Sequence, residues 1–198
     1  MAERRIPKLK TERLELKPFI EISAKQILDY SFRNRDRFSG VSPERPKDFY
    51  TERYWQEEIE KSRIEFEMRS SLRLALVLRT DPERVIGVVH FSQVARGPFQ
   101  ACYLGYGISH EVEGKGLMSE ALQEAIRYLF KEWNLHRIMA NHMPENERSG
   151  RLLEKLGFVA EGIAKEYLLI DGKWRDHVLT SLTNRDWIDT QRELKPQN

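Results

Sequence analysis

The pattern that most restricts how this chain can fold is a strand, a helix and a second strand in immediate succession between residues 101 and 142. Strand-like runs occupy 99–109 and 135–142, and between them apolar residues recur at intervals of three and four, as on one face of a helix. Two strands joined by such a crossover are parallel. We therefore expect one parallel pair whose ends splay and leave a slot for a narrow ligand above the start of the helix.

A short loop with two glycines around a lysine joins the first of these strands to the helix. Gly114 and Gly116 have no side chain that would keep a ligand away from the backbone. The first N–H groups of a helix have no partner within it, and the helix dipole places positive charge there. Lys115 adds a full positive charge, and the first carboxylate of the helix is Glu120. The loop therefore suits phosphate or pyrophosphate. The alternative is that both glycines are plain turn residues.

Strand and helix patterns continue on both sides of this unit. Turn signals lie at 81–84 and 171–172, and the polar stretch 33–46 is expected to be a mobile loop. The predicted fold class is α/β (α+β): a mixed, mostly antiparallel twisted sheet of about seven strands, with the splayed parallel pair at its centre, and about four helices. Strands are expected at 11–18, 72–78, 85–94, 99–109, 135–142, 158–170 and 173–182, and helices at 23–32, at 47–69, from the glycine loop to about 133, and at 145–156.

Composition and charge narrow the class of protein. The 198 residues are enough for one domain, so we interpret 1–198 as a single domain with a flexible tail at 188–198. A formal net charge of +2 is too small for a general nucleic-acid binder, and no apolar run is long enough for a membrane helix. Cys102 is the one cysteine, which excludes an internal disulfide and favours a reducing cytoplasm. No histidine forms a metal-ligand spacing with cysteine or carboxylates, so no metal site is expected.

Four signature segments lie in order along the chain. They are Thr11-Glu12-Arg13-Leu14-x-Leu16-x-Pro18, Glu111-x-x-Gly114-x-Gly116, Asn146-x-x-Ser149-x-x-Leu152-x-x-x-Leu156-Gly157-Phe158, and Glu161-Gly162 followed by Leu168-x-Ile170-Asp171-Gly172-Lys173-Trp174-Arg175-Asp176. Together they resemble the GNAT superfamily of N-acetyltransferases over about residues 8–187. Within it they resemble the RimJ/RimL type, which acetylates protein N-termini. The last segment and the run 114–122 are most similar to the ribosomal-protein-alanine N-acetyltransferases of the RimJ type.

One residue departs from the pattern of that family. Most members have Gln or Arg where this chain has Glu111. A solvated carboxylate beside a pyrophosphate would repel it by about 1 kcal/mol. Because main-chain N–H groups do most of the binding in such loops, we expect the Glu111 side chain to point to solvent.

The resemblance implies that acetyl-CoA is the co-substrate and that it binds at the glycine loop. The end of the preceding strand, at Gly107 and Ile108, would pair its backbone with the pantetheine arm and supply N–H groups to the oxyanion. Asn146 would hydrogen-bond the pantetheine; the alternative is that it only caps the following helix. The pyrophosphate would lie on Val112, Glu113, Gly114, Lys115, Gly116 and Leu117.

Acetyl transfer to an amine also needs groups that move protons. Ser149 lies one helical turn after Asn146 and could protonate the leaving thiolate, and Tyr106 is a rival donor. Glu166, on the strand before the last hairpin, could meet the incoming amine. Each has a structural alternative: a helix cap for Ser149, a core or rim tyrosine for Tyr106 and a solvated charge for Glu166.

Three functions follow as hypotheses. The first is transfer of acetyl to a protein N-terminus, that of a ribosomal protein with N-terminal alanine, by direct attack in a ternary complex. A free α-amine, with a pKa near ~8 against ~10.4 for lysine, is partly neutral without a dedicated base. The second is acetylation of a small amine such as an amino acid, a polyamine or an antibiotic. The third is a non-catalytic CoA-binding, ribosome-associated module. No direct nucleic-acid specificity is expected, and both a monomer and a homodimer stay open.

Overall fold

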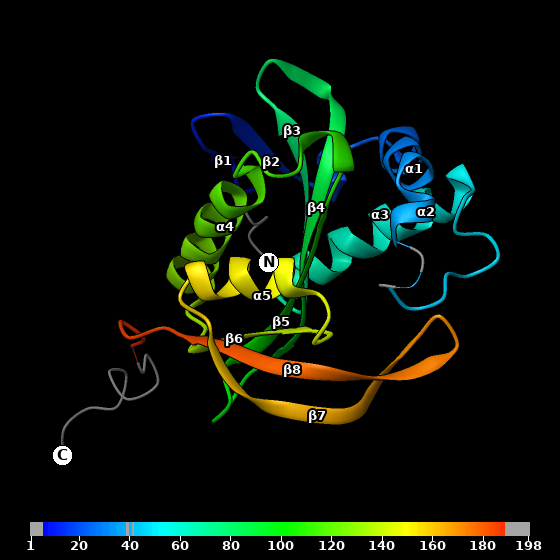
Figure 1. Ribbon diagram of the computed structural model, residues 1–198. Helices are drawn as coiled ribbons and strands as arrows, with labels where there is room; N and C mark the ends of the chain where they lie inside the picture. Colours follow the sequence, from blue (N-terminus) through cyan, green and yellow to red (C-terminus); the bar gives the residue numbers. More distant parts are fainter. Residues whose placement is uncertain (1–5, 39, 41, 189–198) are drawn as a thin grey trace.

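An eight-stranded sheet is the central layer of the computed structural model, which describes residues 6–38, 40 and 42–188 (Figure 1). The strands lie in the order β1-β2-β3-β4-β5-β6-β8-β7. Every neighbouring pair is antiparallel except β5 and β6, as the strand–helix–strand pattern predicted. The strands are β1 (Leu9–Lys10), β2 (Leu14–Pro18), β3 (Leu72–Leu78), β4 (Asp81–Ala95), β5 (Ala101–Ile108), β6 (Arg137–His142), β7 (Val159–Ile170) and β8 (Lys173–Thr183).

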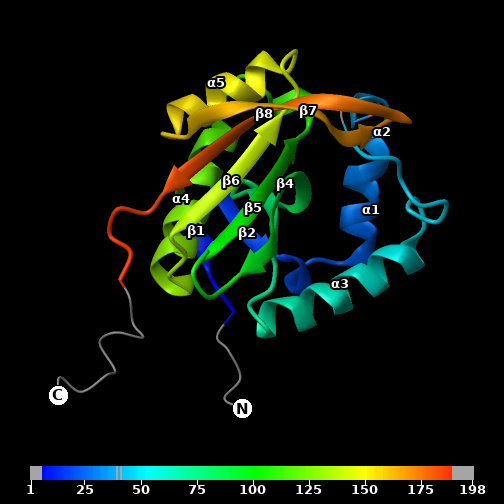
Figure 2. The same cartoon turned by 90° about the horizontal axis from the view of Figure 1, so that it is seen from below.

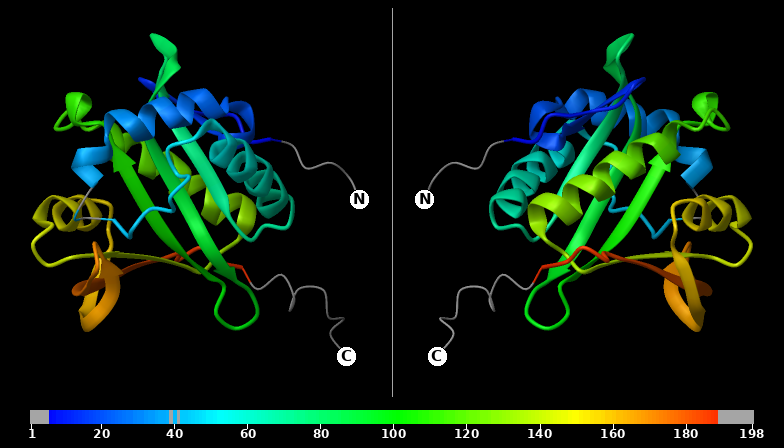
Figure 3. Two further views of the ribbon diagram at one scale, coloured as in Figure 1. Left: turned by 90° about the vertical axis from the view of Figure 1, so that its right-hand side faces the viewer. Right: turned by 90° about the vertical axis from the view of Figure 1, so that its left-hand side faces the viewer.

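Helices cover both faces of this sheet. α4 lies on one face and α1 and α3 lie on the other, with the strands between them (Figures 2 and 3). α5 follows β6 and contributes apolar side chains to the same core as α4. The helices are α1 (Ala24–Arg33), α2 (Arg35–Phe38), α3 (Glu52–Glu67), α4 (Leu117–Trp133) and α5 (Glu147–Lys155), with 3₁₀ turns η1 (Phe19–Glu21) and η2 (His110–Val112).

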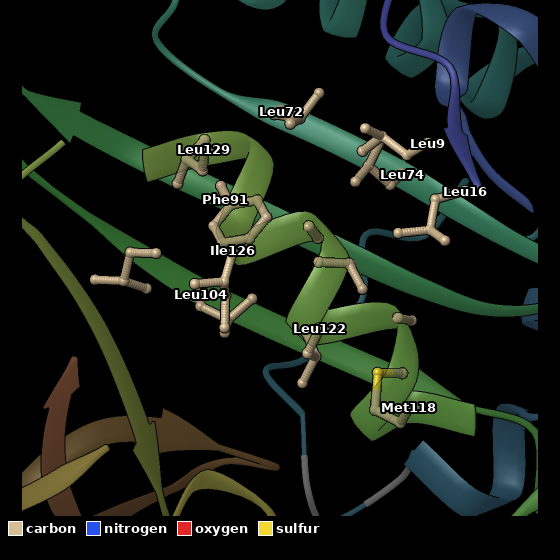
Figure 4. Close-up of a cluster of buried hydrophobic side chains, with 14 of the residues drawn as sticks. Leu9, Leu16, Leu72, Leu74, Phe91, Leu104, Met118, Leu122, Ile126 and Leu129 are labelled. Atoms are coloured by element: carbon tan, nitrogen blue, oxygen red, sulfur yellow. The ribbon is translucent and has the colours of Figure 1, made fainter. Parts of the chain in front are cut away.

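Two apolar cores result from this layering. The larger lies between the sheet and α4 (Figure 4). Leu122 and Leu129 are fully buried there, and burial of each side chain stabilises the fold by about 2–3 kcal/mol. The smaller core lies beneath α1 and α3. The apolar face predicted for α4 is confirmed by its buried residues Met118, Leu122, Ala125, Ile126, Leu129 and Trp133.

The parallel pair separates after three residues. Pairing between β5 and β6 covers 101–103 and 137–139. β5 then continues to Ile108, while β6 continues to His142 along β8, so in the described chain these two ends are not paired with each other. The loop that follows β5 leads directly into α4. The prediction of a splayed pair above a helix start is therefore confirmed.

The prediction of a turn at 81–84 was wrong by two residues. It lies at 79–80, and 81–84 belong to β4. The register between β3 and β4 shifts at this point. This bulge leaves Pro82 outside regular pairing, which suits a residue that has no N–H to donate.

The helix expected at 47–69 begins later than predicted. Thr51 caps α3, because its side chain accepts a hydrogen bond from the Tyr54 N–H at 3.3 Å. The stretch 33–46 contains the short helix α2, which was not expected. Its predicted mobility stays a prediction, and residues 39 and 41 lie outside the described chain.

The eighth strand arises because β1 pairs with β2, which the sequence pattern did not indicate. The flexible tail was expected at 188–198, and 189–198 lie outside the described residues. Within the described ranges no helix is long and apolar enough to cross a bilayer.

Candidate active site

Tyr106 and Ser149 meet where β5 and β6 separate. Tyr106 lies in the splayed part of β5 and Ser149 in the first turn of α5, and their hydroxyl oxygens are 2.6 Å apart. Burial raises the pKa of Tyr106, and the hydrogen bond with Ser149 offsets only part of that rise, so the phenol keeps its proton at neutral pH. The two residues that were expected to be rival proton donors thus form one hydrogen-bonded pair.

Asn146 is the N-cap of α5. Its Oδ1 accepts a hydrogen bond from the Ser149 backbone N–H at 3.2 Å. The capping interaction orients the carboxamide, and among the described residues its Nδ2 has no hydrogen-bond partner. The cap and a ligand contact are therefore compatible, because they use different atoms of the side chain.

The loop between β5 and α4 has the backbone shape of an anion site. Gly114 and Gly116 adopt left-handed conformations, with φ of +71° and +75°, which glycine tolerates without strain. Gly116 is the N-cap of α4, and no side chain caps this helix. The N–H groups of the first turn therefore lack a side-chain partner at the positive end of the helix dipole.

Arg13, from the first signature segment, supports this loop. Its Nη1 donates to the Lys115 carbonyl at 2.9 Å, and its Nε donates to Glu120 at 2.7 Å. Thr11 also hydrogen-bonds Glu120. Burial opposes ionisation of Glu120, but the hydrogen bonds from Thr11 and Arg13 prevail and lower its pKa. The carboxylate in the first turn of α4 is thus neutralised by Arg13, which lies in the segment between β1 and β2.

Glu113 joins three parts of the molecule. Its carboxylate forms ion pairs with Arg37 of α2 and Arg148 of α5, and it lies 3.3 Å from His110. The Glu113 side chain is only 13% exposed. Burial and the neighbouring guanidinium of Arg148 lower the pKa of Arg37. The loop is therefore tied to both α2 and α5.

Glu111, the residue that departs from the family pattern, has a different setting. Its side chain is 51% exposed and forms an ion pair with Arg84 of β4. This pairing turns the carboxylate away from the loop backbone and towards solvent. The expectation for Glu111 is confirmed.

The other face of β5 meets α1 and α2. A Cβ placed on Gly107 would lie 3.1 Å from Phe38 Cζ and 3.4 Å from the Tyr30 hydroxyl. Asn34, which ends α1, donates from Nδ2 to Ser109 Oγ at 3.0 Å and so ties α1 to the end of β5. The absence of a side chain at Gly107 is therefore required by close packing of α1 and α2 on this strand.

Glu166 is not brought together with Tyr106 and Ser149 by any contact among the described residues. It lies exposed in an irregular part of β7, with a φ of +48°. Its backbone N–H donates to Asp176 Oδ1 at 2.9 Å. Its role towards the amine stays a prediction.

A largely buried polar cluster lies between α3 and the sheet, and no pattern in the sequence predicted it. His90 Nε2 is 2.9 Å from Ser71 Oγ, and Arg73 forms ion pairs with Glu58 and Glu65. Burial and the nearby charge of Arg73 lower the pKa of His90 to about 4, so this imidazole is neutral at neutral pH. Register places His90 opposite Gly105 of β5.

The remaining candidates have structural settings. The His136 ring packs against Trp187, and His142 donates from Nδ1 to the Met143 carbonyl. Cys102 is buried, and burial raises its thiol pKa to about 12, which makes it a poor nucleophile. In the described part of the chain no three His, Cys, Asp or Glu side chains gather as a metal site would require.

The splayed pair, the uncapped helix start and the hydrogen-bonded Tyr106–Ser149 pair suit a transferase that takes its acyl group from a long, narrow, phosphate-bearing donor. The family model "Acetyltransferase (GNAT) domain" matches residues 13–159. The chain belongs to this family and is an acetyl-CoA-dependent N-acetyltransferase.

Similarity to known N-acetyltransferases extends over nearly the full chain. The chain is 46% identical to [ribosomal protein uS5]-alanine N-acetyltransferase of Escherichia coli, covering 92% of this chain and 94% of that protein. The solved structure of ribosomal-protein-S5-alanine acetyltransferase from Vibrio fischeri superimposes with a TM-score of 0.86 at 35% identity, covering 92% and 99%. RimJ of Mycobacterium smegmatis, solved with CoA-disulfide, gives 0.78 at 25% identity, covering 97% and 89%.

Proposed function

We propose that this chain transfers the acetyl group of acetyl-CoA to the N-terminal α-amine of a ribosomal protein that begins with alanine. One observation carries the reaction: the Tyr106–Ser149 hydrogen bond of 2.6 Å lies where β5 leaves β6 above the start of α4. The acceptor is supported by the 46% identity to the E. coli enzyme along nearly its whole length.

Backbone groups hold the acetyl-CoA in this proposal. Ser109 N–H donates to the Ile86 carbonyl of β4 at 2.7 Å. Because N–H groups alternate along a strand, those of Ile108 and Tyr106 point the other way, into the gap left by β6. They pair with the pantetheine arm, and the Ile108 N–H is suited to the oxyanion. Gly107 contributes by having no side chain.

The pyrophosphate lies on the loop, where the residues fit its charge. Val112 and Glu113 shape the loop, because their own N–H groups donate to the Ser109 and His110 carbonyls at 3.2 and 3.1 Å. The pyrophosphate receives the N–H groups of Gly114, Lys115, Gly116 and Leu117. Two left-handed glycines and the uncapped start of α4 leave these groups accessible. Asn146 Nδ2 donates to the pantetheine while Oδ1 keeps capping α5.

Two proton movements complete the transfer. The amine attacks the thioester carbon and loses a proton, and the departing thiolate gains one. The Tyr106–Ser149 pair supplies the second proton, because burial keeps the phenol protonated. A free α-amine with a pKa near ~8 is partly neutral already. Glu166 is our candidate for receiving the first proton through water.

The test is turnover of acetyl-CoA with a peptide that has a free N-terminal alanine, followed by intact mass. The same peptide with a blocked N-terminus is the control, and spermidine and free lysine represent small amines. We expect one added acetyl group on the free peptide alone. Turnover of spermidine without the peptide would move the assignment to a small-amine acetyltransferase, and CoA binding without any turnover would leave a non-catalytic module.

A further inference from the structure

The hydroxyl of Tyr30 is a buried polar group that the structure leaves without a partner. Tyr30 lies in the last turns of α1 and is only 3% exposed. Its Oη has no hydrogen-bond partner among the described residues. Leaving a buried hydroxyl unpaired costs about 1–3 kcal/mol. A phenylalanine would fill the same space without that cost, so the hydroxyl needs an explanation outside packing.

This hydroxyl points at the strand that borders the slot. A Cβ on Gly107 would lie 3.4 Å from the Tyr30 Oη, and Gly107 immediately precedes Ile108. Alternation along β5 directs Tyr106 to the side of α4 and α5, whereas position 107 faces α1 and α2. Tyr30 and the Tyr106–Ser149 pair therefore approach the same short stretch of strand from opposite faces.

The hydroxyl groups on the two faces of β5 are placed for different roles in the transfer. A thioester lying in the gap leaves its thiol on the side of Tyr106 and Ser149 if those groups protonate it. The attacking amine needs its own position close to the carbonyl carbon, separate from that of the leaving thiol, and the other face of β5 offers one. That is the face on which the Tyr30 hydroxyl is free.

We propose that the Tyr30 hydroxyl binds the acceptor amine, accepting a hydrogen bond from one of its N–H groups so that the nitrogen lone pair faces the thioester. This inference rests on the proposed function, because it takes an amine as the second substrate. Tyr30 is an acceptor-binding residue that the sequence motifs do not include.

The surroundings fit hydrogen bonding and not proton abstraction. Burial raises the pKa of Tyr30 well above its ordinary value, although the guanidinium groups of Arg37 and Arg45 act in the other direction. The phenol therefore stays protonated, and its oxygen keeps lone pairs for an amine N–H. The Phe38 ring packs near Tyr30, with centroids 6.1 Å apart, and against Gly107. An entering amine has to displace this ring.

The decisive variant is Tyr30→Phe, which removes one oxygen and keeps the ring. Acetyl-CoA binding is measured by calorimetry, and kcat and KM are measured with the free N-terminal alanine peptide. Thermal unfolding is followed in parallel. Tyr128→Phe is the matched control: it is on α4, on the opposite face, and its hydroxyl is partnered with Trp133.

We expect Tyr30→Phe to lower kcat/KM for the peptide at least tenfold, to leave the acetyl-CoA Kd within twofold, and to leave the melting temperature unchanged or higher. Tyr128→Phe should keep wild-type kcat/KM. A peptide kcat/KM within twofold of wild type would overturn the proposal, and so would a weakened acetyl-CoA Kd or a lower melting temperature. If the wild-type protein itself acetylates no peptide, the proposed function fails, which is a separate result.

Discussion

The two sides of β5 present different kinds of polar groups. On the side of α4 and α5, which we propose as the cofactor side, the groups that we assign to acetyl-CoA are main-chain N–H groups, and the nearby side chains are mutually paired. On the side of α1 and α3, which we propose as the acceptor side, the polar groups are side chains from separate elements. One of them, Tyr30, has its hydroxyl unpaired.

This difference predicts which kind of substitution should impair binding on each side. A site made of backbone is damaged by adding atoms, because a side chain blocks or repels the ligand. A site made of side chains is damaged by removing atoms. We therefore expect the cofactor side to be sensitive to substitution of its glycines, and the acceptor side to removal of a hydroxyl group such as that of Tyr30.

The largest effect is expected for Gly116→Asp on the cofactor side. The substitution places a carboxylate on the pyrophosphate site and a Cβ on a residue with φ of +75°. We expect the acetyl-CoA Kd to weaken at least a thousandfold, about 4 kcal/mol, measured by calorimetry.

Gly97→Asp separates charge from strain in that experiment. Gly97 has a similar φ of +70°, and a Cβ there would meet nothing within 4 Å. It lies in the turn between β4 and β5, so it shares the cost of about 1–2 kcal/mol for a left-handed residue without touching the loop. An equal loss of acetyl-CoA affinity in both variants would mean that the loop at 112–117 does not bind the pyrophosphate.

The second prediction concerns stability on the acceptor side. The pKa of His90 is about 4 in the folded protein, below the ~6.5 of an unfolded chain. Its neutral form therefore contributes stability that is fully present above pH ~6.5 and is lost as the pH falls towards 4, by at most about 3 kcal/mol. His90→Gln should remove this part of the acid slope in urea unfolding between pH 7 and 4.

An exposed histidine, His136, serves as the control for this dependence of stability on pH. His136→Gln changes a ring that packs on Trp187 and takes no part in the Ser71–His90 pair. Its unfolding curves should keep the wild-type dependence on pH. If His90→Gln keeps that dependence as well, the imidazole is not held neutral by the cluster.

The third prediction tests whether Tyr106 and Ser149 act as one unit. Tyr106→Phe and Ser149→Ala should each lower kcat about tenfold, or 1.4 kcal/mol, with the acetyl-CoA Kd little changed. The double variant should be scarcely worse than either single one, because both hydroxyl groups serve one proton path. Additive losses would mean that they act independently, and if Glu166→Gln alone lowers kcat, the proton path lies at β7.

Sequence reasoning predicted the local structure where it depends on residues that are close in sequence. The loop 112–117, the helix face of α4 and the Asn146–Ser149 spacing are local patterns, and the 3.6-residue period places Ser149 beside Asn146. The splay followed from one crossover connection. These features need no knowledge of contacts between distant segments.

It failed where residues far apart in sequence determine the contact. Tyr30 and Gly107, or Ser71 and His90, meet only after the whole sheet has formed, and nothing local marks them. The support of the loop by Arg13 spans 102 residues of chain to the Lys115 carbonyl. Turn and helix boundaries failed for a smaller reason, because one cap at Thr51 and one bulge at Pro82 outweighed average propensity.

The smallest effect is expected for Glu111→Gln, which compares two carboxylates of one loop. Glu111 is 51% exposed and is paired with Arg84, whereas Glu113 is 13% exposed and is paired with arginines of α2 and α5. Because solvent screens an exposed pair, Glu111→Gln should tighten acetyl-CoA binding by no more than about threefold, ~0.6 kcal/mol, and the gain should vanish in high salt. Glu113→Gln should instead lower the melting temperature, since it leaves Arg37 and Arg148 facing each other. A large, salt-independent change in Kd at Glu111 would show that this side chain faces the pyrophosphate after all, and the cofactor side would then depend on side chains as the acceptor side does.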